Sequence, residues 1–257
     1  NFITNNKNCS VNFFFCFLYC QHIIMDFENK LISGLLIKRY KRFFVDIKLK
    51  NKIITAHCPN TGSMMGLLNK NNKVWVTESL NLKRKLKYTL QIIEDHNSKV
   101  GVNTHLTNKI VLDAIKKNFI KDFNKNIKII TEKVFGINSR FDFYLEDGKN
   151  KYFMEVKNVT LKRKNNIAEF PDSITTRGTK HLNELIAAAK KGYKSYLLFV
   201  IQREDCDKFK VASDIDVEYS KALTKAIKNN VKILCYDCKF SSKGIILNNK
   251  IKFHIDE

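Results

Sequence analysis

The segment that decides the fold is Ser139-Arg140-Phe141-Asp142-Phe143-Tyr144-Leu145, followed by Tyr152-Phe153-Met154-Glu155-Val156-Lys157. Between the two runs lies Glu146-Asp147-Gly148-Lys149-Asn150, whose Asp-Gly pair is typical of a hairpin turn. When Phe143 faces Met154 and Leu145 faces Tyr152, the apolar side chains gather on one face. The segment therefore predicts two antiparallel strands.

The same register, with Phe141 opposite Val156, places Asp142 directly opposite Glu155 on the other face, with about 5 Å between their Cβ atoms. Two carboxylates at that spacing can share a hard cation such as Mg²⁺ or Mn²⁺, and the Val156 carbonyl can add a third ligand. Lys157 could then orient a water molecule or stabilise charge on a phosphate. We therefore expect catalytic residues at Asp142, Glu155 and Lys157, a metal site at Asp142, Glu155 and Val156, and no organic cofactor. The alternative is a solvated strand face of alternating acids and bases.

The character of the chain changes near residue 98. Residues 31–97 contain several short strand-like runs and little helical pattern, which favours a small closed β-barrel. Beyond them, an apolar stripe from Leu106 to Ile115 predicts a helix capped by Thr104, and strand and helix patterns then alternate. The sequence therefore predicts a mixed α/β protein with a barrel over residues 25–97 and an α/β domain over residues 98–257.

The first 24 residues differ from the rest of the chain. They contain Lys7, no acidic residue and an apolar run that is too short to cross a membrane, which takes about 20 residues. We expect translated upstream sequence that ends before Met25, with a targeting segment as the alternative. The seven cysteines are scattered, which indicates reduced thiols in a cytoplasmic protein without a membrane partner.

The charge of the chain points to a polyanion as partner. Basic residues number 46 and acidic residues 25, for a formal net charge of +21. The alternative is a genome rich in A and T, whose mutational bias places lysines on solvated faces. Three clusters that hold rare arginines favour nucleic acid, most simply DNA. These DNA-binding candidates are Arg39, Lys41, Arg42, Lys83, Arg84, Lys85, Arg177, Lys180 and His181.

Each cluster also has a structural interpretation. Tyr40, Phe43 and Tyr88, which interleave with the bases of the first two clusters, can equally belong to the barrel core. The third cluster begins a predicted helix, where free N–H groups suit phosphate, but an ordinary helix start capped by Thr179 is the alternative.

Several blocks of the sequence resemble the sugar fermentation stimulation proteins. They include His57-Cys58-Pro59-Asn60-Thr61-Gly62-Ser63-Met64, Val100-Gly101-Val102-Asn103-Thr104-His105, Glu155-Val156-Lys157-Asn158-Val159-Thr160-Leu161 and Thr176-Arg177-Gly178-Thr179-Lys180-His181-Leu182. The resemblance implies an OB-like barrel, a C-terminal restriction-endonuclease-like domain, DNA binding with little sequence preference and a regulatory link to sugar use. It carries the Asp…Glu-x-Lys positions of such nucleases onto Asp142, Glu155 and Lys157.

Two functional hypotheses therefore stand beside each other. One is a DNA-binding protein of low sequence specificity, and the other is a nuclease that depends on Mg²⁺ or Mn²⁺. The sequence leaves the oligomeric state and the choice between DNA and RNA open.

Overall fold

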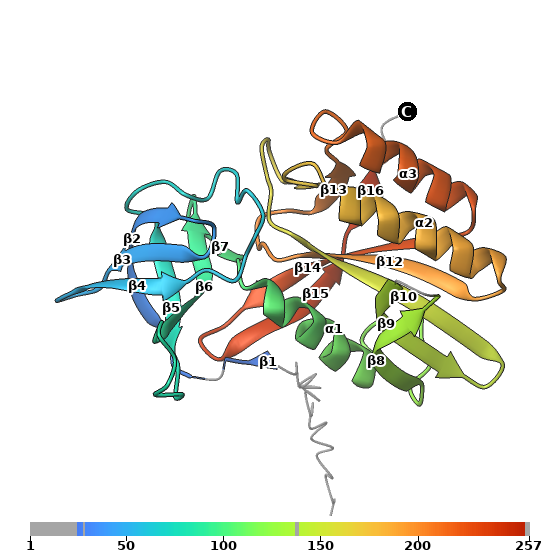
Figure 1. Cartoon of the computed structure of the whole chain (residues 1–257), viewed down its shortest axis with the longest axis horizontal. Coiled ribbons are helices and arrows are strands. Elements are labelled where there is room, and N and C mark those ends of the chain that lie inside the picture. The colour runs from blue at the N-terminus through green and yellow to red at the C-terminus, as the bar shows by residue number, and fades with distance from the viewer. Residues whose placement is uncertain (1–24, 28, 137–138, 255–257) are drawn as a thin grey trace, which may run out of the picture.

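The computed structural model describes residues 25–27, 29–136 and 139–254, which form a small barrel and a larger α/β domain (Figure 1). The expectation for residues 1–24, including Cys9, Cys16 and Cys20, lies outside the described residues. The four described cysteines, Cys58, Cys206, Cys235 and Cys238, are free and buried. Within the described ranges, no helix combines the length and apolar character needed to cross a membrane.

The barrel confirms the β-rich reading of the first part of the chain. Its strands are β2 (Ile32–Tyr40), β3 (Phe44–Lys48), β4 (Ile53–His57), β5 (Lys73–Glu78), β6 (Tyr88–Asp95) and β7 (Ser98–Gly101). They follow the order β4-β3-β2-β5-β6-β7, and a parallel pairing of β4 with β6 closes five of them into a ring. Leu36, Val45 and Leu90 fill the interior and are fully buried.

The sequence pattern did not show where β2 ends. Lys41 and Arg42 adopt φ angles of 46° and 60°, and this left-handed pair reverses the chain before β3. The barrel sheet also extends through β7, so the junction between the two domains follows Gly101 rather than residue 97.

The second domain has a seven-stranded sheet in the order β1-β15-β14-β12-β10-β9-β8. Its strands are β1 (Met25–Asp26), β8 (Lys128–Phe135), β9 (Ser139–Asp147), β10 (Asn150–Val159), β12 (Lys194–Ile201), β14 (Lys232–Phe240) and β15 (Gly244–Lys250). A smaller sheet contains β11 (Ile167–Phe170), β13 (Lys208–Val211) and β16 (Lys252–His254).

Helices cover both faces of the large sheet (Figure 1). The helical elements are η1 (Thr104–Leu106), α1 (Thr107–Lys116), α2 (Thr176–Lys190) and α3 (Val217–Lys228). One core cluster joins α1 to the sheet and a second joins α2 and α3 to it. This two-layered burial explains why β12 is buried over almost its whole length.

The helix starts differ in detail from the expected caps. Asn103, not Thr104, caps η1 by accepting a hydrogen bond from the backbone N–H of His105. Thr175, not Thr179, caps α2 by accepting one from the backbone N–H of Gly178. Both caps place a polar side chain just before the first free N–H groups, as helix starts require.

Candidate functional site

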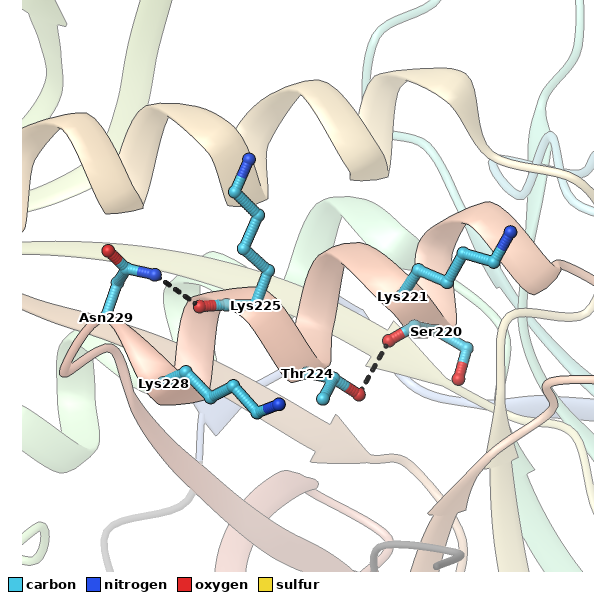
Figure 2. A pocket seen from close by; sticks show the side chains of 6 residues that line it. All are labelled: Ser220, Lys221, Thr224, Lys225, Lys228 and Asn229. Carbon is cyan, nitrogen blue, oxygen red and sulfur yellow. Dashed lines mark hydrogen bonds between the residues drawn. The ribbon is translucent and has the colours of Figure 1, made fainter.

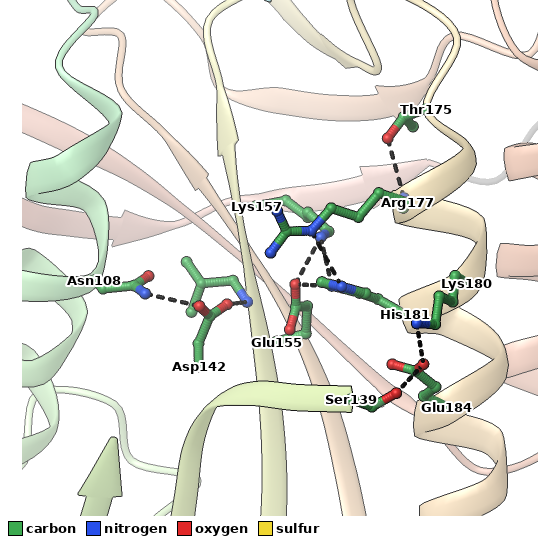
Figure 3. Close-up of polar contacts among 12 residues, drawn as sticks. Asn108, Ser139, Asp142, Glu155, Lys157, Thr175, Arg177, Lys180, His181 and Glu184 are labelled. Carbon is green, nitrogen blue, oxygen red and sulfur yellow. Dashed lines mark hydrogen bonds and ion pairs between the residues drawn. The ribbon is translucent and has the colours of Figure 1, made fainter. Parts of the chain in front are cut away.

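The predicted carboxylates meet where four elements of the second domain converge (Figure 3). Asp142 comes from β9, while Glu155 and Lys157 come from β10. Asn108 approaches from α1, and His181 approaches from α2. We name Asp142, Glu155, Lys157 and His181 the carboxylate cluster.

The hairpin itself has the predicted register, with Phe143 opposite Met154 and Leu145 opposite Tyr152. The regular backbone pairing of β9 with β10 ends at Phe143, however. At the next position, the side chain of Asp142 rather than a backbone carbonyl of β9 bonds to β10. Its Oδ2 accepts a hydrogen bond of 2.7 Å from the backbone N–H of Val156. Asp142 is therefore held against β10 by its own carboxylate rather than as a ladder partner of Glu155.

The predicted side of the sheet is wrong for one residue of the hairpin, Phe141. Phe141 does not join Phe143 and Met154 in the cluster below α1, but packs in the cluster below α2 and α3. Its ring centre lies 4.9 Å from that of Phe153. The strand changes face around Asp142, so Asp142 contacts α1 while Glu155 contacts α2.

Asp142 has an unusual environment for an acid. Burial and the neighbouring charge of Glu155 raise its pKa to about 6, although hydrogen bonds from Val156 and Asn108 oppose this shift. The Asn108 side-chain amide donates to Asp142 Oδ1 at 2.8 Å. Asn108 could not be predicted from local patterns, because its contact with Asp142 spans 34 positions.

Glu155 is almost fully buried and only one of its oxygens is satisfied. Oε1 accepts a hydrogen bond of 2.7 Å from Lys157 Nζ and also contacts His181 Nδ1. Oε2 is buried and has no hydrogen-bond partner among the described residues. Burial alone would raise the pKa of Glu155, but the bonds and charges of His181 and Lys157 outweigh it and lower that pKa.

His181 was predicted to contact DNA at the surface, but its side chain is only 11% exposed and lies against Glu155. Arg177 Nε lies 3.4 Å from His181 Nε2, and a guanidinium can only donate. Nε2 accepts this contact, and Nδ1 faces both Glu155 Oε1 and Lys157 Nζ, which lies 3.3 Å away. His181 thus orients Glu155, and direct contact of His181 with DNA stays a prediction.

A cavity of about 340 Å³ opens onto these groups. Its lining includes Asp142, Glu155, Val156, Lys157 and Arg177. The unsatisfied Glu155 Oε2 and the neighbouring Asp142 carboxylate fit a hard divalent cation, which prefers oxygen ligands. The described residues hold no group of three or more His, Cys, Asp or Glu side chains placed for a metal, so backbone and water oxygens would complete such a site.

The basic residues predicted on the barrel have different roles. Arg39 is used internally, because its guanidinium donates to the carbonyls of Asn60, Gly62 and Arg42 at 2.7–3.0 Å. Lys41 and Arg42 lie exposed in the turn after β2. Lys83, Arg84 and Lys85 lie in the loop between β5 and β6. On α2, Lys180 forms an ion pair with Glu184 at 3.6 Å, and Arg177 is exposed.

A second hollow, of about 330 Å³, lies between the barrel and the second domain. Its lining includes His57, Arg84, His105 and Lys109. His105 also lines the carboxylate cavity, so the two hollows adjoin. Sequence reasoning missed His57 and His105 as site residues, because the ring-to-ring approach of 6.4 Å depends on the folded junction.

A third hollow lies on the outer surface of α3 and is shown in Figure 2. It is lined by Ser220, Lys221, Thr224, Lys225, Lys228 and Asn229 and shares none of these residues with the other two hollows. Lys221 pairs with Glu218 on the same helix at 3.0 Å. These lysines form a solvated helix face and supply a useful comparison for charge effects.

The fold defines the class of proteins that join a closed OB barrel to a C-terminal α/β domain. Residues 37–102 match the SfsA N-terminal OB domain, and residues 105–244 match the sugar fermentation stimulation protein RE domain. The chain belongs to the sugar fermentation stimulation protein family.

Relatives and a solved structure agree with this assignment. The chain is 54% identical over 228 residues to the sugar fermentation stimulation protein homolog of Pelagibacter ubique (strain HTCC1062), covering 89% of this chain and 98% of the relative. It is 41% identical to the homolog of Bartonella quintana (strain Toulouse), covering 90% and 100%. The structure of Pyrococcus furiosus SfsA in complex with Ca²⁺ matches with a TM-score of 0.82 and 26% identity, covering 90% and 99%.

Proposed function

We propose that this protein binds nucleic acid, DNA above all, along the two adjoining hollows and with little sequence preference. The observation that supports this most is the shared residue His105, which joins the hollow of Arg84 and Lys109 to the cavity of Lys157 and Arg177. Cationic side chains along a continuous path suit a phosphate backbone and read no base sequence. A regulatory role in sugar use, which the name of the relatives suggests, would act through this binding.

Fluorescence anisotropy with DNA would test this proposal. We expect the affinity to fall roughly thousandfold between 50 and 200 mM salt, as several phosphate contacts require. The double variant Arg84→Gln and Lys85→Gln should bind DNA about tenfold more weakly, because two phosphate contacts are lost.

The matched control is Lys225→Gln with Lys228→Gln on α3, which removes the same charge from the separate hollow of Figure 2. This control should change the affinity by less than about twofold. Equal losses in the two double variants would show that net charge alone drives binding, and affinity independent of salt would contradict the proposal.

A second candidate function is hydrolysis of the phosphodiester bond, and the unsatisfied Glu155 Oε2 beside Asp142 favours it. Asp142, Glu155 and the Val156 carbonyl would hold Mg²⁺ or Mn²⁺, which would supply Lewis-acid activation when bound. A structure of a relative in complex with Ca²⁺ supports a hard cation of this class. Lys157, whose Nζ lies 2.7 Å from Glu155 Oε1, would stabilise negative charge on a phosphate, and His181 would keep Glu155 in position.

A cleavage assay on single- and double-stranded DNA and RNA would test this second function. We expect cutting with Mg²⁺ or Mn²⁺, none in EDTA, and a loss of at least about a hundredfold in Asp142→Ala, Glu155→Ala and Lys157→Ala. Lys225→Gln should cut like the original chain. DNA binding without any cutting would leave a binding protein, and cutting that survives in Glu155→Ala would remove the cluster from the reaction.

A further inference from the structure

The loop between β5 and β6, residues 79–87, exposes two leucines to solvent. Leu80 is 82% exposed and Leu82 is 88% exposed, which makes them the most exposed large apolar side chains among the described residues. Single exposed leucines are ordinary, but two leucines that lie two positions apart in one loop form a small exposed apolar patch.

Hydrogen bonds within the loop fix the position of this apolar patch. The Ser79 backbone N–H donates to the Lys87 carbonyl at 2.7 Å and closes the base of the loop. The Ser79 hydroxyl accepts from the N–H of Asn81 at 3.2 Å, and the Asn81 side chain accepts from the N–H of Lys83 at 3.0 Å. The loop therefore presents Leu80 and Leu82 to solvent in a defined conformation.

The charged residues within the loop are all positive. Residues 79–87 include Lys83, Arg84, Lys85 and Lys87 and no acidic residue. In the described part of the chain, none of these four cations forms an ion pair with a carboxylate. The partner that fits should combine dense negative charge with accessible apolar faces, and a polynucleotide with exposed bases has both.

The position of the loop agrees with such a partner. Ser79 and Arg84 line the hollow that also contains His57 and His105, and this hollow adjoins the carboxylate cavity. The loop also joins the last two strands of the closed ring, a position from which OB barrels contact oligonucleotides. A strand that passes this loop would continue toward Asp142 and Glu155.

We propose that residues 79–87 form a wedge in which Leu80 and Leu82 pack against unpaired or unstacked bases while the four cations hold the backbone. The ligand that the protein prefers would then be nucleic acid with a single-stranded or bulged segment rather than a continuous duplex. This inference rests on the proposed binding of nucleic acid, but it names a ligand class and residues that binding by charge alone does not require.

The experiment uses the full chain with three DNA ligands of equal length: a single strand, a duplex with a bulge and a continuous duplex. The first two carry 2-aminopurine, whose fluorescence rises when the base unstacks. We expect the original chain to prefer the single strand and the bulge, and to raise the fluorescence.

In Leu80→Ser with Leu82→Ser, binding to these two ligands should weaken by on the order of tenfold, because apolar burial is lost. The fluorescence rise should disappear, and the salt dependence should stay unchanged because no phosphate contact is removed. Both side chains are exposed, so thermal melting should match the original chain. The control is Ile53→Ser with Val217→Ser, two exposed apolar residues elsewhere, which should bind as the original chain does.

The outcomes separate this inference from the proposed function. If the original chain binds DNA but the leucine variant keeps the same affinities and fluorescence rise, the wedge is wrong and the binding function stands. If the original chain binds none of the ligands, the proposed function itself fails. If the leucine variant loses only binding to vesicles of phosphatidylcholine and phosphatidylglycerol, the loop contacts a lipid surface and the wedge is overturned.

Discussion

Arg203 and Glu155 are both buried charged side chains of the second domain, with 1% and 3% of their surface exposed, yet their surroundings differ. Arg203 donates to Asp95, Asp205 and the Thr160 carbonyl at 2.7–2.9 Å, and we name this group the junction cluster. It joins Asp95 of the barrel to the second domain. The carboxylate cluster, in contrast, leaves Glu155 Oε2 without a partner among the described residues.

The acids in the two clusters show the consequence. Burial alone would raise the pKa of Asp205, but hydrogen bonds from Arg203 and Lys162 lower it to about 2. Burial and the charge of Glu155 instead raise the pKa of Asp142 to about 6. A cluster that serves stability supplies a partner for each charge, whereas a cluster that binds a ligand leaves charge uncompensated.

The largest effect should come from breaking the junction cluster with Arg203→Met. This change leaves Asp95 buried without its cation and removes the hydrogen bonds from Arg203 to Asp205, which keeps only Lys162, so we expect a loss of about 3–5 kcal/mol in the free energy of unfolding. Denaturation by urea, followed by circular dichroism, would measure it. Arg140→Met is the control, because its partner Glu132 lies 3.8 Å away and both side chains are more than half exposed; it should cost at most about 1 kcal/mol. A similar small loss in both variants would remove the distinction between the clusters.

The fold was more predictable from the sequence than these contacts were. Local patterns were sufficient for the hairpin register, the closed barrel and the helix that Leu106 and Ile110 anchor, because alternation and helical periodicity are properties of neighbouring residues. The turn at Lys41 and Arg42 escaped because neither residue type signals positive φ.

The site was predictable only in part for a related reason. Asp142, Glu155 and Lys157 lie on two strands joined by one turn, so a register was enough to bring them together. The contact of His181 with Glu155 spans 26 positions, and it exists only because α2 packs on β10. Arg39 looked available for DNA, but the folded chain uses its donors for the loop that contains Asn60 and Gly62.

Asp142→Asn should have the second-largest effect and, unlike Arg203→Met, should stabilise the protein when EDTA keeps the site free of metal. The folded-state pKa of Asp142 lies above the ordinary value, so the original chain loses stability as the pH rises from about 4 through 6 and this buried acid ionises. Asparagine has no charge to bury, and the amide of Asn108 can rotate to keep a hydrogen bond with it. We expect the variant to gain on the order of 2 kcal/mol at pH 8 and nothing at pH 3, below the ordinary pKa of an aspartate. Urea denaturation at the two pH values would measure the gain in the free energy of unfolding. An equal gain at both pH values would show that ionisation of Asp142 does not destabilise the folded chain.

The smallest effect should come from Asn108→Ala, which removes one hydrogen bond from the carboxylate cluster. We expect a loss of about 1 kcal/mol in unfolding free energy, since the bond from Asn108 to Asp142 is part-buried. Because that bond lowers the pKa of Asp142, its removal should also raise the pKa further. The pH dependence of stability in the variant should therefore extend to higher pH than in the original chain, which a removed packing contact alone would not cause. Titration of the Asp142 carboxyl by NMR would separate the two, and an unchanged midpoint in Asn108→Ala would mean that Asn108 supports α1 rather than the acid.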